Sequence, residues 1–406
     1  MGKSVVGLDI GASTVRAIQV SKDSKGAFQI EKMAQVSLPL GAVSGGSIND
    51  PNALVKALKT LWKEGKFSTR TVRMGVGSDA MNARVGEVDW APDADLFRIL
   101  PYTPLVTDSL LMTGADKFYL DYHTLSEGTV RTVDPDDPDE TIIERKKFIL
   151  VAGGDREAID AMVKAARSAG LKPISVDITG LALIRAFDHS LVEWAPECLD
   201  VSVDIGADTM TIVFHKAGQP LYMRTVREVN GNAITEHIAV ALKTTPAKAE
   251  LRKFEVLYSA NETPSQSTPS TSIFSEVKDE VPNPEIDTEE DAKRRERNAK
   301  VRPIIAQDAS AIIQVIRATL DHFLSGPAGQ DLTRASGFML SGGMSLTPGL
   351  AERIASEFHA PVIIASPLSS FSNPKRIAKF DEGLLATESS YIVAYGLAVG
   401  EGSSHA

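Results

Sequence analysis

The apolar positions at the start of the chain predict three strands, a helix and a further strand. Two β-branched runs, at 5–10 and 14–20, flank a short polar turn, and their lengths suit two tightly joined strands. Further strands are expected over 28–38 and 71–77. Between them, Asp50 and Pro51 start a helix as N-cap and first helical residue. One face of that helix carries the apolar side chains Leu54, Leu58, Leu61 and Trp62.

The opening pattern recurs in the second half of the chain. The turn reads Asp-Ile-Gly-Ala-Ser-Thr at 9–14 and Asp-Ile-Gly-Ala-Asp-Thr at 204–209, again between β-rich runs. Such a turn can direct backbone N–H groups and hydroxyls at one point, and its glycine lets a phosphate approach the backbone. The aspartate that ends the first strand is then placed to hold magnesium through water. One copy alone would indicate an ordinary hairpin corner, whereas two copies predict a duplicated fold whose halves grip one phosphate chain.

A third glycine-rich turn follows an apolar strand at 338–341. Gly342 and Gly343 end that strand, and a helix is expected to begin with Thr347 as N-cap and Pro348 at its first position. Glycines there let a flat ring lie against the backbone, and a helix N-terminus favours anionic neighbours. Because this turn comes after the second Asp-Ile-Gly turn, we interpret it as an adenosine site.

Residues 79–172 depart from the opening pattern. Strands over 82–88 and 147–152, a short helix over 96–100 and an amphipathic helix over 155–169 indicate a small inserted α/β subdomain at about 80–172. The acidic, proline-punctuated stretch 134–139 is expected to be a solvated hairpin tip. A strand over 173–176 and an apolar helix over 180–187 then return to the first lobe.

The second lobe is expected to continue with a strand over 219–227 and helices over 231–242, 245–257 and 304–323. Residues 259–300 are polar and rich in Ser, Thr, Pro, Glu and Lys, which indicates a disordered or long surface insertion. Within it, the mixed run 293–297 is interpreted as a solvated helix face. The apolar helix over 391–399 is expected to pack.

Length and composition limit the class of protein. A chain of 406 residues suits two lobes, and a net charge of -10 argues against nucleic-acid binding. The single Cys198 excludes an internal disulfide framework or a cysteine-rich metal site. Neither a signal peptide nor an apolar run of ~20 residues is evident, so we expect a cytoplasmic protein without direct membrane insertion.

The paired turns resemble those of the actin, Hsp70 and sugar-kinase superfamily. Within it, the chain resembles the PilM family of type IV pilus assembly and, more distantly, the FtsA family of cell division. The further matching segments, in order, are 100–102, 119–122, 169–173, 182–186, 231–235, 249–253 and 340–343. The inserted subdomain also resembles PilM and FtsA rather than actin.

This resemblance implies an α/β fold of two duplicated, ribonuclease-H-like lobes around a nucleotide cleft. The first lobe would comprise 1–79 and 173–197, with 80–172 inserted. The second would comprise 198–240 and 335–406, with a subdomain at 241–334 that includes the insertion 259–300.

The resemblance also implies ATP and Mg²⁺ as ligands and assigns residues to them. The first phosphate loop would be Asp9, Gly11, Ala12, Ser13, Thr14 and Arg16, and the second Asp204, Gly206, Ala207, Asp208, Thr209 and Thr211. Asp9 and Asp204 would hold the metal through water. Glu250 and Lys253 would reach the ribose and the edge of the adenine. Gly342, Gly343 and Met344 would lie beneath the adenine ring. Two departures are Arg16 in place of the family's usual lysine and Asn230 in place of a glycine.

Asp177 lies near the place where relatives keep a water-orienting residue, and its alternative role is to cap the following helix. The resemblance implies slow or absent ATP hydrolysis by a scaffold at the inner face of the cytoplasmic membrane. Its partners would be the cytoplasmic N-terminal peptide of a PilN-like protein and pilus motor or platform components, with possible self-association. We expect the peptide groove between the first lobe and its inserted subdomain, around residues 100–122.

Three alternatives stay open. One is a small-molecule kinase of the same superfamily, for which no additional substrate motif is evident. Another is an FtsA-like membrane tether, although the polar end 399–406 lacks a basic amphipathic helix. The third is a scaffold with a decayed nucleotide site.

Overall fold

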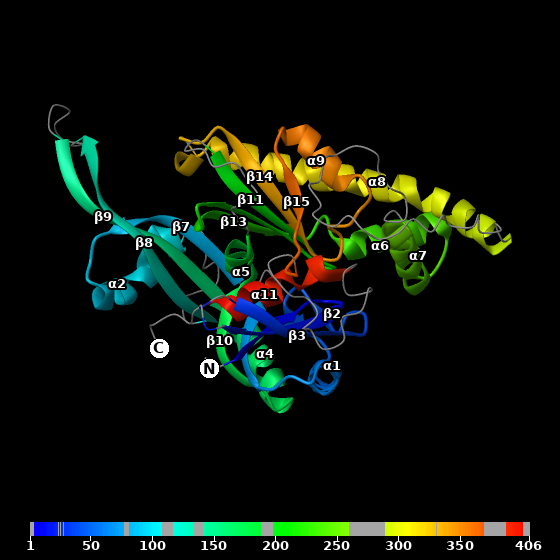
Figure 1. Ribbon diagram of the computed structural model, residues 1–406. Helices are drawn as coiled ribbons and strands as arrows, with labels where there is room; N and C mark the ends of the chain where they lie inside the picture. The colour runs from blue at the N-terminus through cyan, green and yellow to red at the C-terminus, as the bar shows by residue number, and fades with distance from the viewer. Residues whose placement is uncertain are drawn as a thin grey trace.

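The computed structural model describes residues 4–22, 24, 26, 28–76, 81–107, 117–133, 141–187, 198–259, 289–329, 331–368 and 387–400. Figure 1 shows two mixed β-sheets, one above the other, with helices α5 (Thr179–Ala186) and α11 (Ile392–Val399) between them. A smaller sheet extends to one side as a long hairpin. The described part of the chain therefore forms two lobes and a projecting subdomain.

The first sheet has the strand order β10-β6-β1-β2-β3. The strand β1 pairs antiparallel with β2 and parallel with β6, and β6 pairs parallel with β10. The helix α1 (Pro51–Gly65) begins as predicted, with the Asp50 carboxylate accepting a hydrogen bond of 2.9 Å from the Ala53 amide, and its apolar face is buried. The strands are β1 (Val5–Ile10), β2 (Thr14–Lys22), β3 (Phe28–Ser37), β6 (Thr71–Val76) and β10 (Lys172–Ile178).

The second sheet repeats this arrangement. Its order is β13-β12-β11-β14-β15, and the central strand again pairs antiparallel with the next strand in sequence and parallel with a later one. The strands are β11 (Cys198–Ile205), β12 (Met210–Lys216), β13 (Gln219–Val226), β14 (Arg334–Ser341) and β15 (Val362–Ile364). The duplication predicted from two short turns is therefore a duplication of whole sheets.

The helices α5 and α11 join the two lobes. Gly7 and Gly396 mark the tightest contacts: a Cβ on Gly7 would lie 1.9 Å from the Ala394 carbonyl oxygen, and one on Gly396 would lie 1.9 Å from that of Ala182. One buried cluster contains Ala182 of α5, Met223 of the second sheet and Leu397 of α11. The lobes are thus connected by a continuous apolar contact.

The projecting subdomain is a three-stranded antiparallel sheet of order β7-β9-β8. Its strands are β7 (Met81–Asp89), β8 (Phe118–Val133) and β9 (Thr141–Asp155). The strands β7 and β9 are longer than the predicted 82–88 and 147–152, and β8 was not predicted. The helix α2 (Asp93–Ile99), the 3-10 turn η1 (Leu100–Tyr102) and α3 (Pro104–Thr107) accompany it. The acidic stretch 134–139 lies outside the described residues.

The helix α4 (Arg156–Ser168) belongs by its packing to the first sheet. Asp155 caps it by accepting a hydrogen bond of 2.9 Å from the Ala158 amide, and Met162, Ala165 and Ala166 are buried in the core that contains α1. The sequence had placed this helix with the insert because only its position along the chain was evident. The apolar face of α4 packs against the core of the first lobe instead.

Helices α6 (Gly231–Leu242), α7 (Pro246–Ser259) and α8 (Glu289–Leu324) complete the second lobe. The helix α8 is longer than expected, so the end of the range 259–300 is helical from Glu289, while 260–288 lies outside the described residues. Of the run predicted to be solvated, Lys293 to Glu296 are exposed on it, whereas Arg297 is half-buried. Among the described residues, no helix combines the length and apolar content needed to cross a membrane.

Candidate functional site

The two Asp-Ile-Gly turns have the same backbone geometry. The Gly11 amide donates to the Thr14 carbonyl at 3.1 Å, and the Gly206 amide donates to the Thr209 carbonyl at 2.9 Å. Each turn connects the central strand of a sheet to its antiparallel neighbour, so both turns lie at the carboxyl end of that strand. Ala12 and Ser13 complete the first turn.

Asp9 and Asp204 lie one residue before the ends of the two central strands, and the charge of Asp204 acts on Asp9. Burial raises the pKa of Asp9 to about 7, the Arg16 charge opposes this, and the charge of Asp204 raises it further. Burial also raises the pKa of Asp204, against the opposing effects of the Ser341 hydroxyl and Arg16. The Ser341 Oγ donates to the Asp204 carboxylate at 2.7 Å. The acidic corners of the two lobes therefore lie close enough to interact.

Arg16 is the cation shared by these two carboxylates. It stands opposite Asp9 in the β1–β2 register, with Nη1 3.9 Å from the Asp9 carboxylate. Its Nε is buried and has no hydrogen-bond partner among the described residues. In the second half Thr211 occupies the equivalent place opposite Asp204, and its hydroxyl lies 3.3 Å from that of Thr225. A buried, unpartnered guanidinium N–H suits an anionic ligand.

The third turn lies directly against the second. The Met344 amide donates to the Ile205 carbonyl at 3.2 Å, and a Cβ on Gly342, whose φ is 84°, would lie 2.4 Å from that oxygen. Met344 itself is buried in the second core. A Cβ on Gly343 would meet nothing within 4 Å among the described residues, so the open surface of this turn is at Gly343.

The helix that follows this turn differs from the prediction. It is α9 (Leu350–Phe358), and its N-cap is Gly349 with φ 73°, not Thr347. The Thr347 hydroxyl donates instead to the Met344 carbonyl at 2.7 Å, so it stabilises the turn. The expected helix start at Pro348 is wrong by two residues because a local side-chain bond competes with capping.

Lys253 and Glu250 connect α7 to the start of α6. The Lys253 side chain is 2% exposed, and its ammonium donates to the Gly231 carbonyl at 2.8 Å and to the Thr235 hydroxyl at 2.7 Å. Its distance to the Glu250 carboxylate is 2.7 Å. Burial lowers the pKa of Lys253, and Glu250 opposes that shift. Lys253 therefore supports the α6 N-terminus from below, while Glu250 is only half-buried.

The α6 N-terminus in turn contacts the second Asp-Ile-Gly turn. The Gly231 amide donates to the Gly206 carbonyl at 2.9 Å, and the Asn232 amide donates to the Ala207 carbonyl at 2.7 Å. Asn230 caps α6 and its side-chain amide donates to the Asp208 carbonyl at 3.1 Å. These bonds join the second turn to the start of α6.

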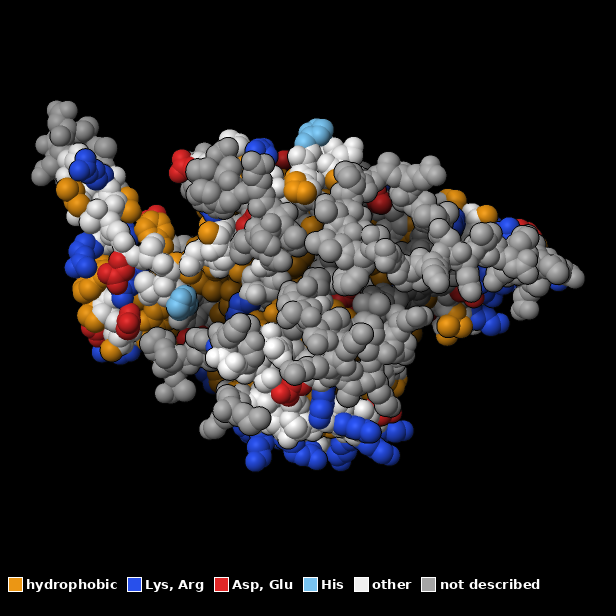
Figure 2. Space-filling view, viewed as in Figure 1, with side chains coloured by type: hydrophobic (Ala, Val, Ile, Leu, Met, Phe, Trp, Pro, Cys, Tyr) orange, Lys and Arg blue, Asp and Glu red, His pale blue; other side chains and the backbone are white. Residues whose placement is uncertain are grey.

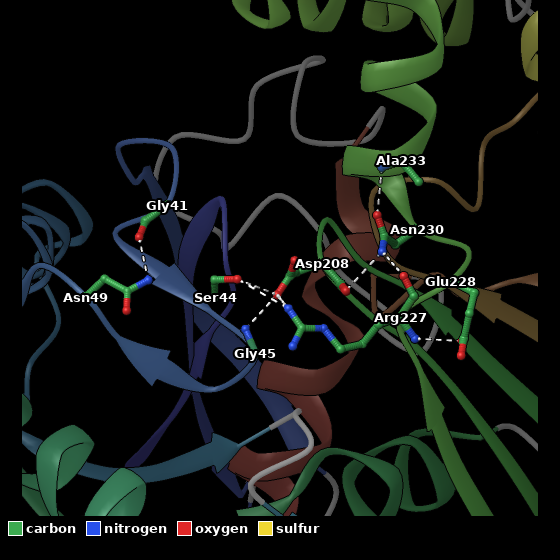
Figure 3. Close-up of polar contacts among 9 residues, drawn as sticks. All are labelled: Gly41, Ser44, Gly45, Asn49, Asp208, Arg227, Glu228, Asn230 and Ala233. Atoms are coloured by element: carbon green, nitrogen blue, oxygen red, sulfur yellow. Dashed lines mark hydrogen bonds and ion pairs between the residues drawn. The ribbon is translucent and has the colours of Figure 1, made fainter.

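Asp208 makes a contact between the lobes that the sequence did not predict. Its carboxylate accepts hydrogen bonds from the Gly45 amide at 2.6 Å and the Ser44 hydroxyl at 3.1 Å, in the hairpin β4 (Val43–Ser44) and β5 (Ser47–Ile48) of the first lobe. Arg227 lies 3.4 Å from the same carboxylate (Figure 3). In the sequence, the adjacent glycines Gly45 and Gly46 were the feature that could have indicated this contact.

Asp177 lies in the same row of the first sheet as Asp9. Both residues pair with Gly75 of β6, which separates them by two strand spacings, ~10 Å. The Asp177 carboxylate accepts from Arg185 of α5, and Arg185 Nε donates to the Gly396 carbonyl at 3.0 Å. Ile178, without a side-chain bond, is the α5 N-cap, so the expected capping role is not observed.

Two equally ordered five-stranded sheets, paired turns and helices between them define the actin-like fold. A family model described as type IV pilus assembly protein PilM matches residues 7–265, and one for cell division protein FtsA matches 201–380. The chain belongs to the PilM family of type IV pilus assembly proteins. No curated protein matches its sequence.

Similar solved structures include the PilM–PilN type IV pilus biogenesis complex. It is 21% identical with a TM-score of 0.71, and the match covers 97% of each chain. The ethanolamine utilization protein EutJ from Carboxydothermus hydrogenoformans is 14% identical with a TM-score of 0.49, over 98% of this chain and 90% of that one. MreB5 of Spiroplasma citri bound to AMPPNP is 14% identical with a TM-score of 0.47, over 98% and 95%.

Proposed function

We propose that the chain binds ATP and magnesium between its two Asp-Ile-Gly turns and, in that state, binds a short peptide of a PilN-like membrane protein. The observation that supports a nucleotide site is that the charged side chains of Asp9, Asp204 and Arg16 lie close together. Two half-buried carboxylates with raised pKa values favour a nearby cation. The buried Arg16 Nε–H, which has no hydrogen-bond partner among the described residues, favours an anion. A magnesium–phosphate group supplies both charges.

The donor set suits magnesium bound to a nucleotide better than a closed metal centre. Within the described ranges, no group of three or more His, Cys, Asp or Glu could hold a metal. Magnesium commonly binds one or two carboxylates and takes its other ligands from water and phosphate oxygens. Asp9 and Asp204 would hold the ion. The remaining backbone amides of the two turns would face the phosphates, since those of Gly11 and Gly206 donate within their own turns. Gly343 would leave room for the base.

The peptide site is proposed on the first lobe and its projecting subdomain. Phe97, Ile99 and Tyr102 are 54%, 41% and 80% exposed on α2 and η1. Exposed large apolar side chains grouped on one short segment favour a protein contact. Membership of the PilM family, together with the similarity to a PilM–PilN complex, supports a PilN-like partner at the inner membrane.

Turnover is proposed to be slow or absent. Hydrolysis needs a carboxylate or amide free to orient water at the terminal phosphate. Asp177 is the nearest predicted candidate, but its carboxylate is paired with Arg185. ATP would act by favouring one arrangement of the lobes through its differential affinity.

Titration calorimetry with Mg-ATP and with a PilN-type N-terminal peptide tests this proposal. Asp9→Ala and Asp204→Ala each remove one of the two carboxylates and are expected to weaken the binding of Mg-ATP by about 10–100-fold. Peptide affinity measured with ATP present should fall with it. Asp321→Ala, on an exposed position of α8, removes a carboxylate elsewhere and should change neither. Unchanged Mg-ATP affinity in both corner variants would contradict the proposal.

A further inference from the structure

One end of the first lobe is strongly basic although the chain as a whole is acidic. The net charge is -10, yet Figure 2 shows Lys and Arg side chains gathered at the lower end of the molecule, where Figure 1 places α1 and α4. We call this surface the basic face. It comprises the exposed residues Lys56, Lys59, Lys63, Lys66, Arg70, Lys164, Arg167 and Lys172.

The basic face is continuous across its elements. Lys56, Lys59 and Lys63 follow one another at helical spacing along α1, so they share one stripe. Arg70 Nη1 lies 3.4 Å from the Gly170 carbonyl, which brings the segment after α1 to the end of α4. The lysine stripe from Lys56 to Lys63 alone spans ~10 Å at the helical rise. This is far wider than a site for one phosphate.

These cations are not explained by internal pairing. Among the residues that the structure describes, none of the eight has a carboxylate within salt-bridge distance. Lys63 and Arg167 lie in the last turns of α1 and α4, where they stabilise the helix ends. Lys56 and Lys59 lie further inside α1, and like charges at this spacing destabilise a helix. Helix stability alone therefore does not account for the stripe.

The chemistry of the basic face favours a diffuse anionic surface. Six of its eight residues are lysines, which act as compact point charges, whereas bidentate recognition of a single phosphate uses the planar fork of arginine. Five of the cations lie on the two helices, and Lys66, Arg70 and Lys172 lie in the segments that follow them. A bilayer with anionic lipids attracts such lysines additively within a Debye length of ~8 Å, so the more distant acidic parts of the chain are screened.

We propose that the basic face of α1 and α4 lies on the anionic phospholipid surface of a membrane. This contact is peripheral, inserts no side chain into the hydrocarbon, and adds to any tether that a membrane protein provides. It does not depend on the nucleotide site or on the peptide site. It would orient the lobe with α1 and α4 toward the bilayer.

Co-sedimentation with vesicles tests this inference. The full chain should bind vesicles of phosphatidylglycerol mixed equally with phosphatidylcholine, in low salt, and should not bind phosphatidylcholine alone. The combined variant Lys56→Gln, Lys59→Gln, Lys63→Gln should partition about 100-fold more weakly, since each lysine near an anionic bilayer contributes a factor of about five. These exposed helix positions accept glutamine without loss of fold.

A matched control removes the same charge from another helix. Lys293→Gln, Arg294→Gln, Arg295→Gln takes three exposed cations from α8, which Figure 1 places on the other lobe. This variant should keep vesicle binding, and both variants should keep peptide affinity. The proposal is overturned by equal loss in the two variants, by no binding of the wild type to anionic vesicles, or by an α1 variant that loses only an acidic protein partner.

Discussion

At the scale of single residues, the site is defined by the charged groups of Asp9, Asp204 and Arg16, which have little contact with water. Burial makes ionisation of both Asp9 and Asp204 costly, and the charge of Arg16 lowers that cost for each. Burial favours the protonated form of Asp9 more than usual near neutral pH, because it raises the pKa of this carboxyl to about 7. A bound cation would reverse that balance.

The nucleotide-free protein should therefore be less stable at pH 7.5 than at about pH 5.5, to the extent that Asp9 contributes. The folded pKa of about 7 lies above the ordinary value of 3.8, so the folded state binds more protons between these values. Stability from this group is full below the lower value and falls as pH rises through the folded pKa. Denaturant titrations in EDTA across this range measure it.

Asp9→Asn removes the titrating group while keeping its shape. Its stability should depend less on pH than that of the wild type over the same window. Parallel profiles for the two proteins would show that other groups carry the pH dependence.

At the scale of elements, α5 and α11 decide how the lobes meet. Each helix has a glycine near the contact, but their neighbours differ. A Cβ on Gly396 would strike the Ala182 backbone, whereas one on Gly180 would lie 2.7 Å from the flexible end of Met223. The same substitution should thus have different costs in the two helices.

Gly396→Ala should lower the free energy of unfolding by about 3 kcal/mol, because helix backbones cannot shift cheaply. Gly180→Ala is the matched control: it makes the same chemical change, and the Met223 side chain can rotate away at a cost below about 1.5 kcal/mol. Urea unfolding of both variants measures the difference. Equal destabilisation would contradict the close helix contact.

At the scale of the whole molecule, a hydrogen bond joins Asp208 to Gly45, which lies 163 positions away in the sequence. Asp208 was predicted to belong to a phosphate loop, and its carboxylate accepts a hydrogen bond from the Gly45 amide of the other lobe. A carboxylate at this point repels a phosphate, so its contact with the hairpin is the more favourable use of its charge. It holds the two lobes together beside the proposed nucleotide site.

Asp208→Ala should expose the Gly45 amide and speed its hydrogen exchange by at least about tenfold, since one charge-assisted bond contributes about 1.5–3 kcal/mol. Asp208→Asn keeps an acceptor oxygen and should preserve most of the protection. Exchange of the segment 43–48, followed by mass spectrometry, reports this. Equal exchange in the two variants would show that the amide is protected by something else.

The sequence by itself determined the duplicated turns, most elements and the family. These follow from strand and helix periodicity, from capping at Asp50, and from a six-residue motif that occurs twice. Such signals are local, because each depends on residues within a few positions of one another. They hold whichever way the elements are later packed.

Only the tertiary structure decided what the predicted site residues contact. It buried Lys253 beneath α6, gave the Asp177 carboxylate to Arg185 and turned Asp208 toward Gly45. It also collected the lysines of α1 with cations of α4 on one face. The physical reason is that burial, ion pairing and surface potential depend on neighbours far away in the chain, which no local pattern specifies.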